Sequence, residues 1–220
     1  ADQRIDDTAE LFTSRPDGSG NVRASGPLVA DGDVFAIAWA PDSSRIAYNA
    51  DQLANDVIDL FSSRPDGSGN TTVSAVQFNG DVFDFAWAPD SSRIAYRTDQ
   101  ITDDVFEVFT SGPDGSGNVR ISGPLVAGGQ VFSFKWAPDG SRIAYLADQL
   151  TDNLLELFTS RPDGSGNVRV SGPITGTGNG LVGQFAWSPD SAYVAYVSTQ
   201  RSSTRELFTA RPDGSLNPLV

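Results

Sequence analysis

Carboxylates dominate the reactive chemistry of this sequence. It holds 28 Asp and Glu against 15 Lys and Arg, with no His and no Cys. Aspartates recur in loops that begin Asp-Gln, and the candidate binding residues there are Asp51, Asp56, Asp99, Asp103, Asp104, Asp148 and Asp152. Such side chains could attract a cationic partner, hold a hard cation, or act as an acid and base pair on a glycoside.

The missing residue types narrow these alternatives. Without His and Cys the chain lacks the usual general base, the Ser-His-Asp arrangement and the commonest zinc ligands. Calcium is the one cofactor considered, but no loop has EF-hand spacing, so solvated loop charge is favoured and no metal or cofactor is predicted. Because the acids recur at equivalent positions, no isolated pair suggests catalysis, and the chain is predicted not to be an enzyme.

Two charged residues occur in a single repeat only. Lys135 is the only lysine, and the equivalent positions of the other repeats are occupied by Ala38, Ala86 and Ala186. Asp84 lies on the same strand face in the preceding repeat. If first strands line a central channel, Asp84 and Lys135 could form a shielded ion pair. The alternatives are a solvated lysine and an anion site at the channel mouth.

Five copies of one sequence motif define the structural elements that position these residues. The phrase Leu-Phe-Thr-Ser-Arg-Pro-Asp-Gly-Ser-Gly-Asn starts at Leu11 and recurs, with changes, after 49, 48, 49 and 50 residues. A second phrase built on a tryptophan recurs after 48, 49 and 51 residues, at Trp39, Trp87, Trp136 and Trp187. Periods of this size indicate repeated supersecondary units that bury their apolar faces against neighbours.

Each unit is expected to hold four antiparallel strands. In the third complete unit these are residues 130–136, 142–146, 154–160 and 168–171, separated by Pro-Asp turns and polar loops. This pattern predicts an all-β β-propeller with about 49 residues per blade. The four tryptophans are predicted to be buried between blades. Since Ser replaces Gly140 in three turns, that turn position is predicted not to need positive φ.

The residues also carry a family resemblance. Trp39-Ala-Pro-Asp-Ser-Ser-Arg-Ile-Ala-Tyr48, with the Pro-Asp-Gly phrase that follows it, resembles the TolB-type propeller repeat, and Trp187-Ser-Pro-Asp190 is the best match. The resemblance covers almost the whole chain. It implies a propeller fold and an extracytoplasmic bacterial location, periplasmic or secreted. Such propellers serve as docking proteins, gates on peptidases or surface modules, and the blade number here departs from the six-bladed TolB domain.

The strand count predicts that residues 1–220 form a single domain, which holds four complete blades and one partial blade. The partial blade is 1–32, and the complete blades are 33–80, 81–129, 130–180 and 181–220. An unpaired hairpin at residues 1–25 would be an exposed edge, so it is expected to pack on another blade or another chain. A ring completed by a second molecule is favoured over a half position in a five-part ring or the cut end of a longer chain.

Charge and composition complete the functional expectation. A net charge of −13 argues against nucleic acid as a partner, and no apolar run is long enough for membrane insertion. The favoured function is a non-catalytic protein-interaction or scaffold module with an acidic loop face. The alternatives are an engineered or recently amplified repeat array with no selected ligand, and a carbohydrate-binding or carboxylate-based glycosidase propeller.

Overall fold

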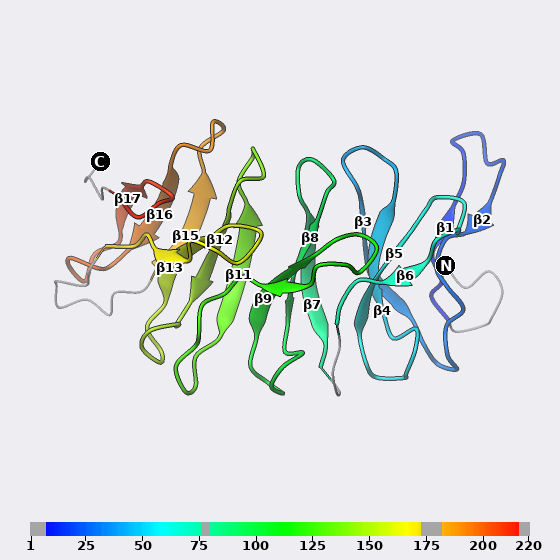
Figure 1. Ribbon diagram of the computed structural model, residues 1–220, viewed down its shortest axis with the longest axis horizontal. Helices are drawn as coiled ribbons and strands as arrows, with labels where there is room; N and C mark the ends of the chain where they lie inside the picture. Colours follow the sequence, from blue (N-terminus) through cyan, green and yellow to red (C-terminus); the bar gives the residue numbers. More distant parts are fainter. Residues whose placement is uncertain (1–7, 76–79, 173–181, 216–220) are drawn as a thin grey trace. The chain divides into compact units, whose positions relative to one another are not determined.

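A computed structural model describes residues 8–75, 80–172 and 182–215, which form strands and connecting loops (Figure 1). The strands are β1 (Phe12–Thr13), β2 (Val22–Arg23), β3 (Val34–Trp39), β4 (Ile46–Ala50), β5 (Asp59–Ser63), β6 (Thr71–Thr72), β7 (Val82–Trp87), β8 (Ile94–Thr98), β9 (Glu107–Ser111), β10 (Val119–Arg120), β11 (Val131–Trp136), β12 (Ile143–Ala147), β13 (Glu156–Ser160), β14 (Val168–Arg169), β15 (Val182–Trp187), β16 (Val194–Ser198) and β17 (Glu206–Ala210). No described helix could span a bilayer.

The strands form antiparallel sheets in chain order. Three sheets have four strands, β3 to β6, β7 to β10 and β11 to β14; β1 with β2 and β15 to β17 make smaller ones. The predicted all-β fold is confirmed, and the strands expected in the third complete unit agree with β11 to β14 within a few residues. The chain forms two compact units, residues 1–104 with 111–118 and residues 105–110 with 119–220. The single 1–220 domain stays a prediction.

Aromatic stacking across the middle strands builds the core of each sheet. Tyr145 lies opposite Phe158, and their ring centroids are 5.6 Å apart with planes inclined by 18°. Both rings are buried, as are their equivalents Tyr48 and Phe61. Burial of an aromatic ring contributes about 1.5–3 kcal/mol, so the Tyr and Phe positions of the repeat are core positions.

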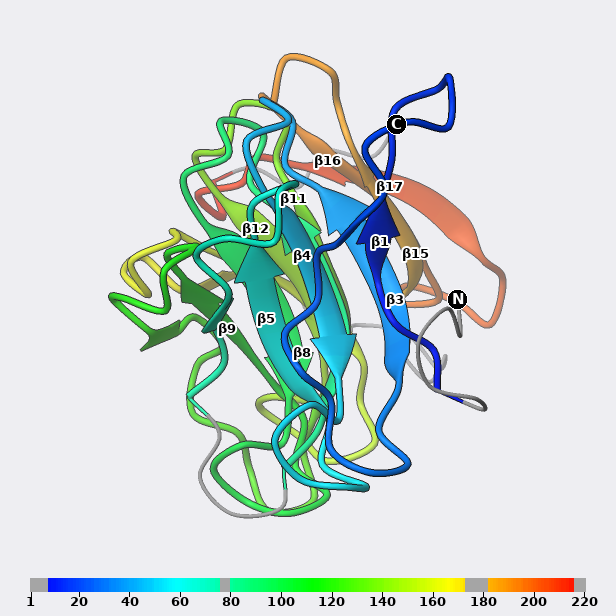
Figure 2. The same cartoon turned by 90° about the vertical axis from the view of Figure 1, so that its right-hand side faces the viewer.

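The amino-terminal hairpin packs face to face on the next sheet. Leu11 and Ala24 join Tyr48 and Phe61 in one apolar cluster, and Figure 2 shows β1 alongside β3. Val34 N donates to Ala9 O at 2.8 Å. The described part of the hairpin therefore packs on another blade as predicted, although β1 pairs in a sheet only with β2.

The prediction that all four tryptophans are buried is wrong. Trp87 is 8% exposed and its Nε1–H donates to Ala38 O of the preceding first strand at 3.0 Å. Trp187 donates in the same way to Lys135 O at 3.1 Å. Trp39 is 49% exposed because no first strand precedes β3 in the described residues. The preceding repeat thus covers Trp87, and no described strand does the same for Trp39.

The prediction for the first turn is also wrong. Ser43, Ser91 and Ser191 have φ of 61°, 63° and 59°, so the position does require the left-handed region. Ser91 Oγ accepts from Asp42 N at 3.1 Å, and Ser191 Oγ accepts from Asp139 N at 3.0 Å. In these two turns a hydrogen bond to the preceding repeat offsets the strain that glycine would avoid.

Glycine substitutions separate the strain of the left-handed backbone from the stabilisation by the serine hydrogen bond. Ser43 accepts no such bond from a described residue, so Ser43→Gly should raise the free energy of unfolding by about 0.5–1 kcal/mol through relief of left-handed strain. Ser91→Gly loses a hydrogen bond worth about 0.5–1.5 kcal/mol and should leave stability near wild type. Urea unfolding of both variants measures the difference. Equal stabilisation by both would contradict the compensating role of Ser91 Oγ.

Candidate functional site

Three of the predicted binding aspartates are buried inside the loops. Asp51, Asp99 and Asp148 are 4%, 7% and 3% exposed. Asp99 Oδ1 accepts from Asp81 N at 2.6 Å, and its Oδ2 accepts from Asp104 N at 3.1 Å. Asp148 makes the equivalent bonds with Gln130 N and Asn153 N. The prediction that these three carboxylates face a partner is wrong, because they hold the loop backbone against the start of the first strand.

The other four predicted aspartates are exposed; they are Asp56, Asp103, Asp104 and Asp152. Asp56 and Asp104 have φ of 61° and 62°, and Asn153 takes the equivalent place in the third loop with φ of 62°. Asp and Asn tolerate this conformation better than other non-glycine residues. The left-handed backbone therefore explains why Asp is present at positions 56 and 104. Asp103 and Asp152 are neither buried nor in the left-handed region.

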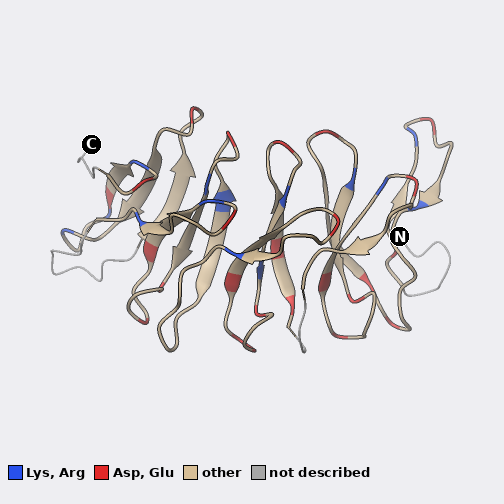
Figure 3. Cartoon of the chain, viewed as in Figure 1, with Lys and Arg blue, Asp and Glu red and all other residues tan. Residues whose placement is uncertain are grey.

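The first compact unit gathers five carboxyl groups, defined here as the acidic loop cluster: Asp56, Asp81, Asp99, Asp103 and Asp104. One carboxylate oxygen from each of Asp99, Asp103 and Asp104 lies within 4.8 Å of the others. The pKa of Asp81 is raised, mainly by burial and further by the charges of Asp99, Asp103 and Asp56. Figure 3 shows acidic residues in the loops at both ends of the strands. The cluster is a place of concentrated negative charge.

The acidic loop cluster is a weak candidate for a metal site. A cation would find oxygens of Asp99, Asp103 and Asp104 together, which suits a hard ion. Both oxygens of Asp99, however, already accept backbone N–H bonds. The expectation of no metal or other cofactor stays a prediction.

Asp84 and Lys135 each find a partner within their own unit. Asp84 Oδ2 lies 2.7 Å from Arg97 Nε, and Asp84 and Arg97 are opposite residues of β7 and β8. Lys135 Nζ donates to Phe185 O at 3.1 Å and lies 5.2 Å from the centre of the Phe185 ring. The predicted Asp84–Lys135 ion pair stays a prediction. Arg97 could have been predicted as the partner of Asp84, because the antiparallel register of the hairpin places the two residues opposite each other.

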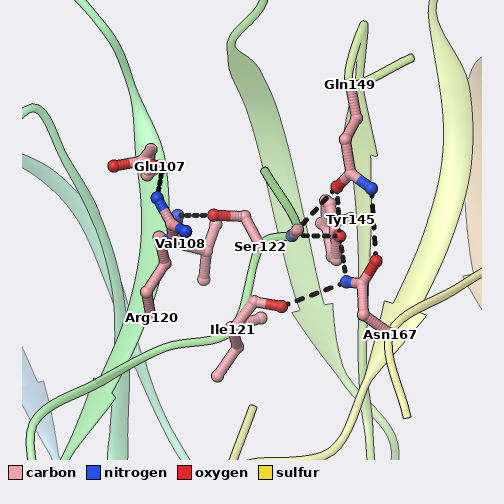
Figure 4. Close-up of polar contacts among 9 residues, drawn as sticks. Glu107, Val108, Arg120, Ile121, Ser122, Tyr145, Gln149 and Asn167 are labelled. Carbon is pink, nitrogen blue, oxygen red and sulfur yellow. Dashed lines mark hydrogen bonds and ion pairs between the residues drawn. The ribbon is translucent and has the colours of Figure 1, made fainter. Parts of the chain in front are cut away.

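Sequence reasoning missed a buried polar network that joins neighbouring repeats (Figure 4). Tyr145 Oη donates to Gln149 Oε1 at 2.7 Å, and Gln149 Nε2 donates to Asn167 Oδ1 at 3.2 Å. Gly123 N, from the preceding repeat, donates to Tyr145 Oη at 3.2 Å and to Gln149 Oε1 at 3.0 Å. Asn167 Nδ2 also donates to Ile121 O at 3.1 Å. We call Gly123, Tyr145, Gln149 and Asn167 the tyrosine network.

The tyrosine network recurs through the chain. In the first unit Gly26, Tyr48, Gln52 and Asn70 make the same set of contacts. The Tyr-x-x-x-Gln spacing at Tyr48, Tyr96, Tyr145 and Tyr196 is the signal that could have revealed it. Since Tyr and Gln are buried and bonded in these copies, the network holds the fold together and is not a ligand site.

Replacement of Tyr145 tests the network through its pH dependence. Burial raises the pKa of Tyr145 from 10.0 to about 12. Its contribution to stability is therefore fully present below pH 10 and is lost as the pH rises towards 12. Tyr145→Phe should cost about 1–3 kcal/mol near pH 8. It should also reduce the alkaline loss, of which Tyr96, with its pKa raised by burial to about 12, supplies another part. Urea unfolding from pH 8 to 11 measures both effects.

The control is Tyr193→Phe, because Tyr193 is 40% exposed and outside the network. This variant should keep wild-type stability and its pH profile. An unchanged alkaline profile in Tyr145→Phe would contradict the assignment.

Comparison with known proteins gives no match to a family model. No curated protein matches in sequence either. Solved structures do match. A TolB protein from Agrobacterium tumefaciens aligns over 96% of this chain and 79% of its own, with TM-score 0.55 and 16% identity.

Enzyme structures match as well. An oligogalacturonate lyase in complex with manganese aligns over 81% of this chain and 48% of its own, with TM-score 0.53 and 16% identity. A prolyl endopeptidase aligns over 94% of this chain with TM-score 0.60 and 15% identity, and this chain spans 28% of its length. At such identities the likeness shows the fold alone. The chain has a TolB-like β-propeller repeat fold, as its Trp-Pro-Asp and Pro-Asp-Gly phrases indicated.

Proposed function

We propose that the chain is a non-catalytic scaffold module that binds a cationic protein segment through the acidic loop cluster. Asp103 and Asp104 are exposed, and no ion pair between described side chains includes either of them. The raised pKa of Asp81 reflects in part the repulsion from Asp99, Asp103 and Asp56. A Lys-rich or Arg-rich segment would relieve this repulsion. The observation that carries the proposal is the close grouping of Asp99, Asp103 and Asp104, whose carboxylate oxygens lie within 4.8 Å of one another.

The fold supports this function and its setting by analogy. The TolB match covers most of both chains, and the TolB-like repeat is the basis for proposing an extracytoplasmic bacterial location. The enzyme matches include long chains of which this one spans a minor part. Their activities are therefore a weaker guide than the local geometry.

A second candidate is a recently amplified repeat array with no selected ligand. Residues Glu10–Arg23 and Glu156–Arg169 are identical over 14 positions. Such identity between distant repeats favours recent duplication. This candidate differs from the first because it predicts no saturable binding at the acidic loop cluster.

Charge removal at the acidic loop cluster tests the binding function. Asp103→Asn with Asp104→Asn removes two charges and keeps the left-handed backbone, since Asn153 already occupies the equivalent of position 104. Calorimetric titration with a lysine decapeptide at low salt should show saturable binding that weakens at least threefold in this double variant. Binding should also weaken as salt screens the charges.

The matched control is Asp17→Asn with Asp163→Asn. It removes two exposed charges from Pro-Asp-Gly turns and keeps the side-chain oxygen that accepts from Ser19 N or Ser165 N. The control should bind the peptide as the wild type does. Equal weakening in both double variants, or no saturable binding by the wild type, would contradict the proposal.

The proposed absence of catalysis has its own measurement. The carboxylates of the acidic loop cluster recur as backbone acceptors or surface groups, so a panel of aryl glycosides should show no turnover above background. Turnover that disappears in the Asp103→Asn, Asp104→Asn variant would show that the protein is a glycosidase instead.

A further inference from the structure

One 14-residue sequence occurs in two structural contexts. As Glu156–Arg169 it forms β13 and β14, and β13 pairs along five residues with β12. As Glu10–Arg23 it forms β1 and β2, and β1 has two residues that pair only with β2. Because the sequence is identical, the difference comes from the missing neighbour. In the Glu156–Arg169 copy the corresponding edge is paired with β12.

Two further contacts point to the same neighbour. Trp87 and Trp187 donate Nε1–H to a carbonyl of the preceding first strand, but Trp39 Nε1 has no acceptor among the described residues. Ser91 and Ser191 accept from an Asp N–H of the preceding Pro-Asp turn, whereas Ser43 Oγ has no such donor there. The neighbour must supply a first strand and a Pro-Asp turn as well as a second strand.

A groove in the first unit lies where such a hairpin would insert. Its volume is about 510 Å³, and residues 9–14 and 34–37 contribute to its lining. On its β3 side Ile37 is 55% exposed, while the equivalent Phe185 is 6% exposed beneath its neighbour. The groove therefore combines an unpaired strand edge with an uncovered apolar face.

The chain itself supplies hairpins of this kind, and one of them is held less well than the others. The third strand that follows β15 and β16 is β17, which is partly exposed where β5, β9 and β13 are buried throughout. Glu206 makes no ion pair with a described residue, whereas the equivalent Glu156 pairs with Arg169 at 2.8 Å. The residue that corresponds to Arg169 after β17 is Leu219.

We propose that the β15–β16 hairpin of a second copy of this chain occupies the groove, with β1 of the first copy replacing β17 on β16. The incoming hairpin of β1 and β2 brings its own Arg23–Glu10 ion pair, at 2.8 Å. The Trp39 indole then meets Ala186 O, and Ser43 Oγ meets Asp190 N. In the described chain β16 pairs with β17, so β17 must leave β16 before β16 can pair with β1 of the other copy.

The register of the composite sheet follows from the existing ones. Ala144 lies opposite Thr159 and Ala195 lies opposite Thr209, so Thr13 of one copy should lie opposite Ala195 of the other. Leu157 O accepts from Val170 N, which turns the backbone of Leu157 and Thr159 towards β14. The Ala195–Thr13 pair is therefore not hydrogen-bonded, and its Cα atoms should be about 4.5 Å apart, within disulfide range.

The natural absence of cysteine gives a clean experiment. Light scattering on the wild-type full chain should give twice the 23.3 kDa chain mass. The variant Thr13→Cys with Ala195→Cys should form a disulfide between two chains on mild oxidation, seen as a dimer in non-reducing gel electrophoresis. A wild-type mass of one chain at high concentration would overturn the proposal, whether or not the variant folds.

The matched control locks β17 in place. Ala195→Cys with Thr209→Cys joins two residues that already lie opposite each other in one chain, so this variant should stay monomeric when oxidised. A Thr13–Ala195 disulfide within a single chain would overturn the second copy as occupant and would show that the chain's own ends pair. A dimer that persists in the oxidised control would overturn the exchange of β1 for β17.

Discussion

The hydrogen bond from a glycine N–H of one repeat to the tyrosine hydroxyl of the next is the contact on which much of this fold depends. It places a polar group in the interior, so Tyr145 needs Gln149 and Asn167 around it to satisfy the hydroxyl. Tyr145 also stacks on Phe158, which links the polar network to the apolar core of the sheet. No repeat can satisfy its own core alone. Stability is therefore shared between neighbours.

This sharing changes how the acidic residues are understood. A loop aspartate such as Asp99 resembles a binding residue in the sequence, yet it fixes the loop that leads to the next sheet. The exposed aspartates beside it owe part of their frequency to left-handed backbone. The proposed binding function then rests on the few carboxylates without a backbone role in the described structure, chiefly Asp103 within the acidic loop cluster.

The sequence predicted the repeat, the strand order and the TolB-like fold because apolar alternation and Pro-Asp turns are local signals. It did not predict the features that depend on contacts with a neighbouring repeat. Trp39 has the same local sequence as Trp87 but lacks a preceding strand, and Ser91 tolerates positive φ because Asp42 lies beside it. The burial of Asp51, Asp99 and Asp148 depends on backbone donors about 18 residues away, which composition and charge do not reveal.

Recurrence of the tyrosine network has a consequence for the gene. Gly26 meets Tyr48 as Gly123 meets Tyr145, so these two junctions are chemically interchangeable. A recombination event that adds or removes one whole repeat would recreate the same junction on both sides of the break. The number of repeats can therefore change by one whole repeat without loss of this hydrogen bond.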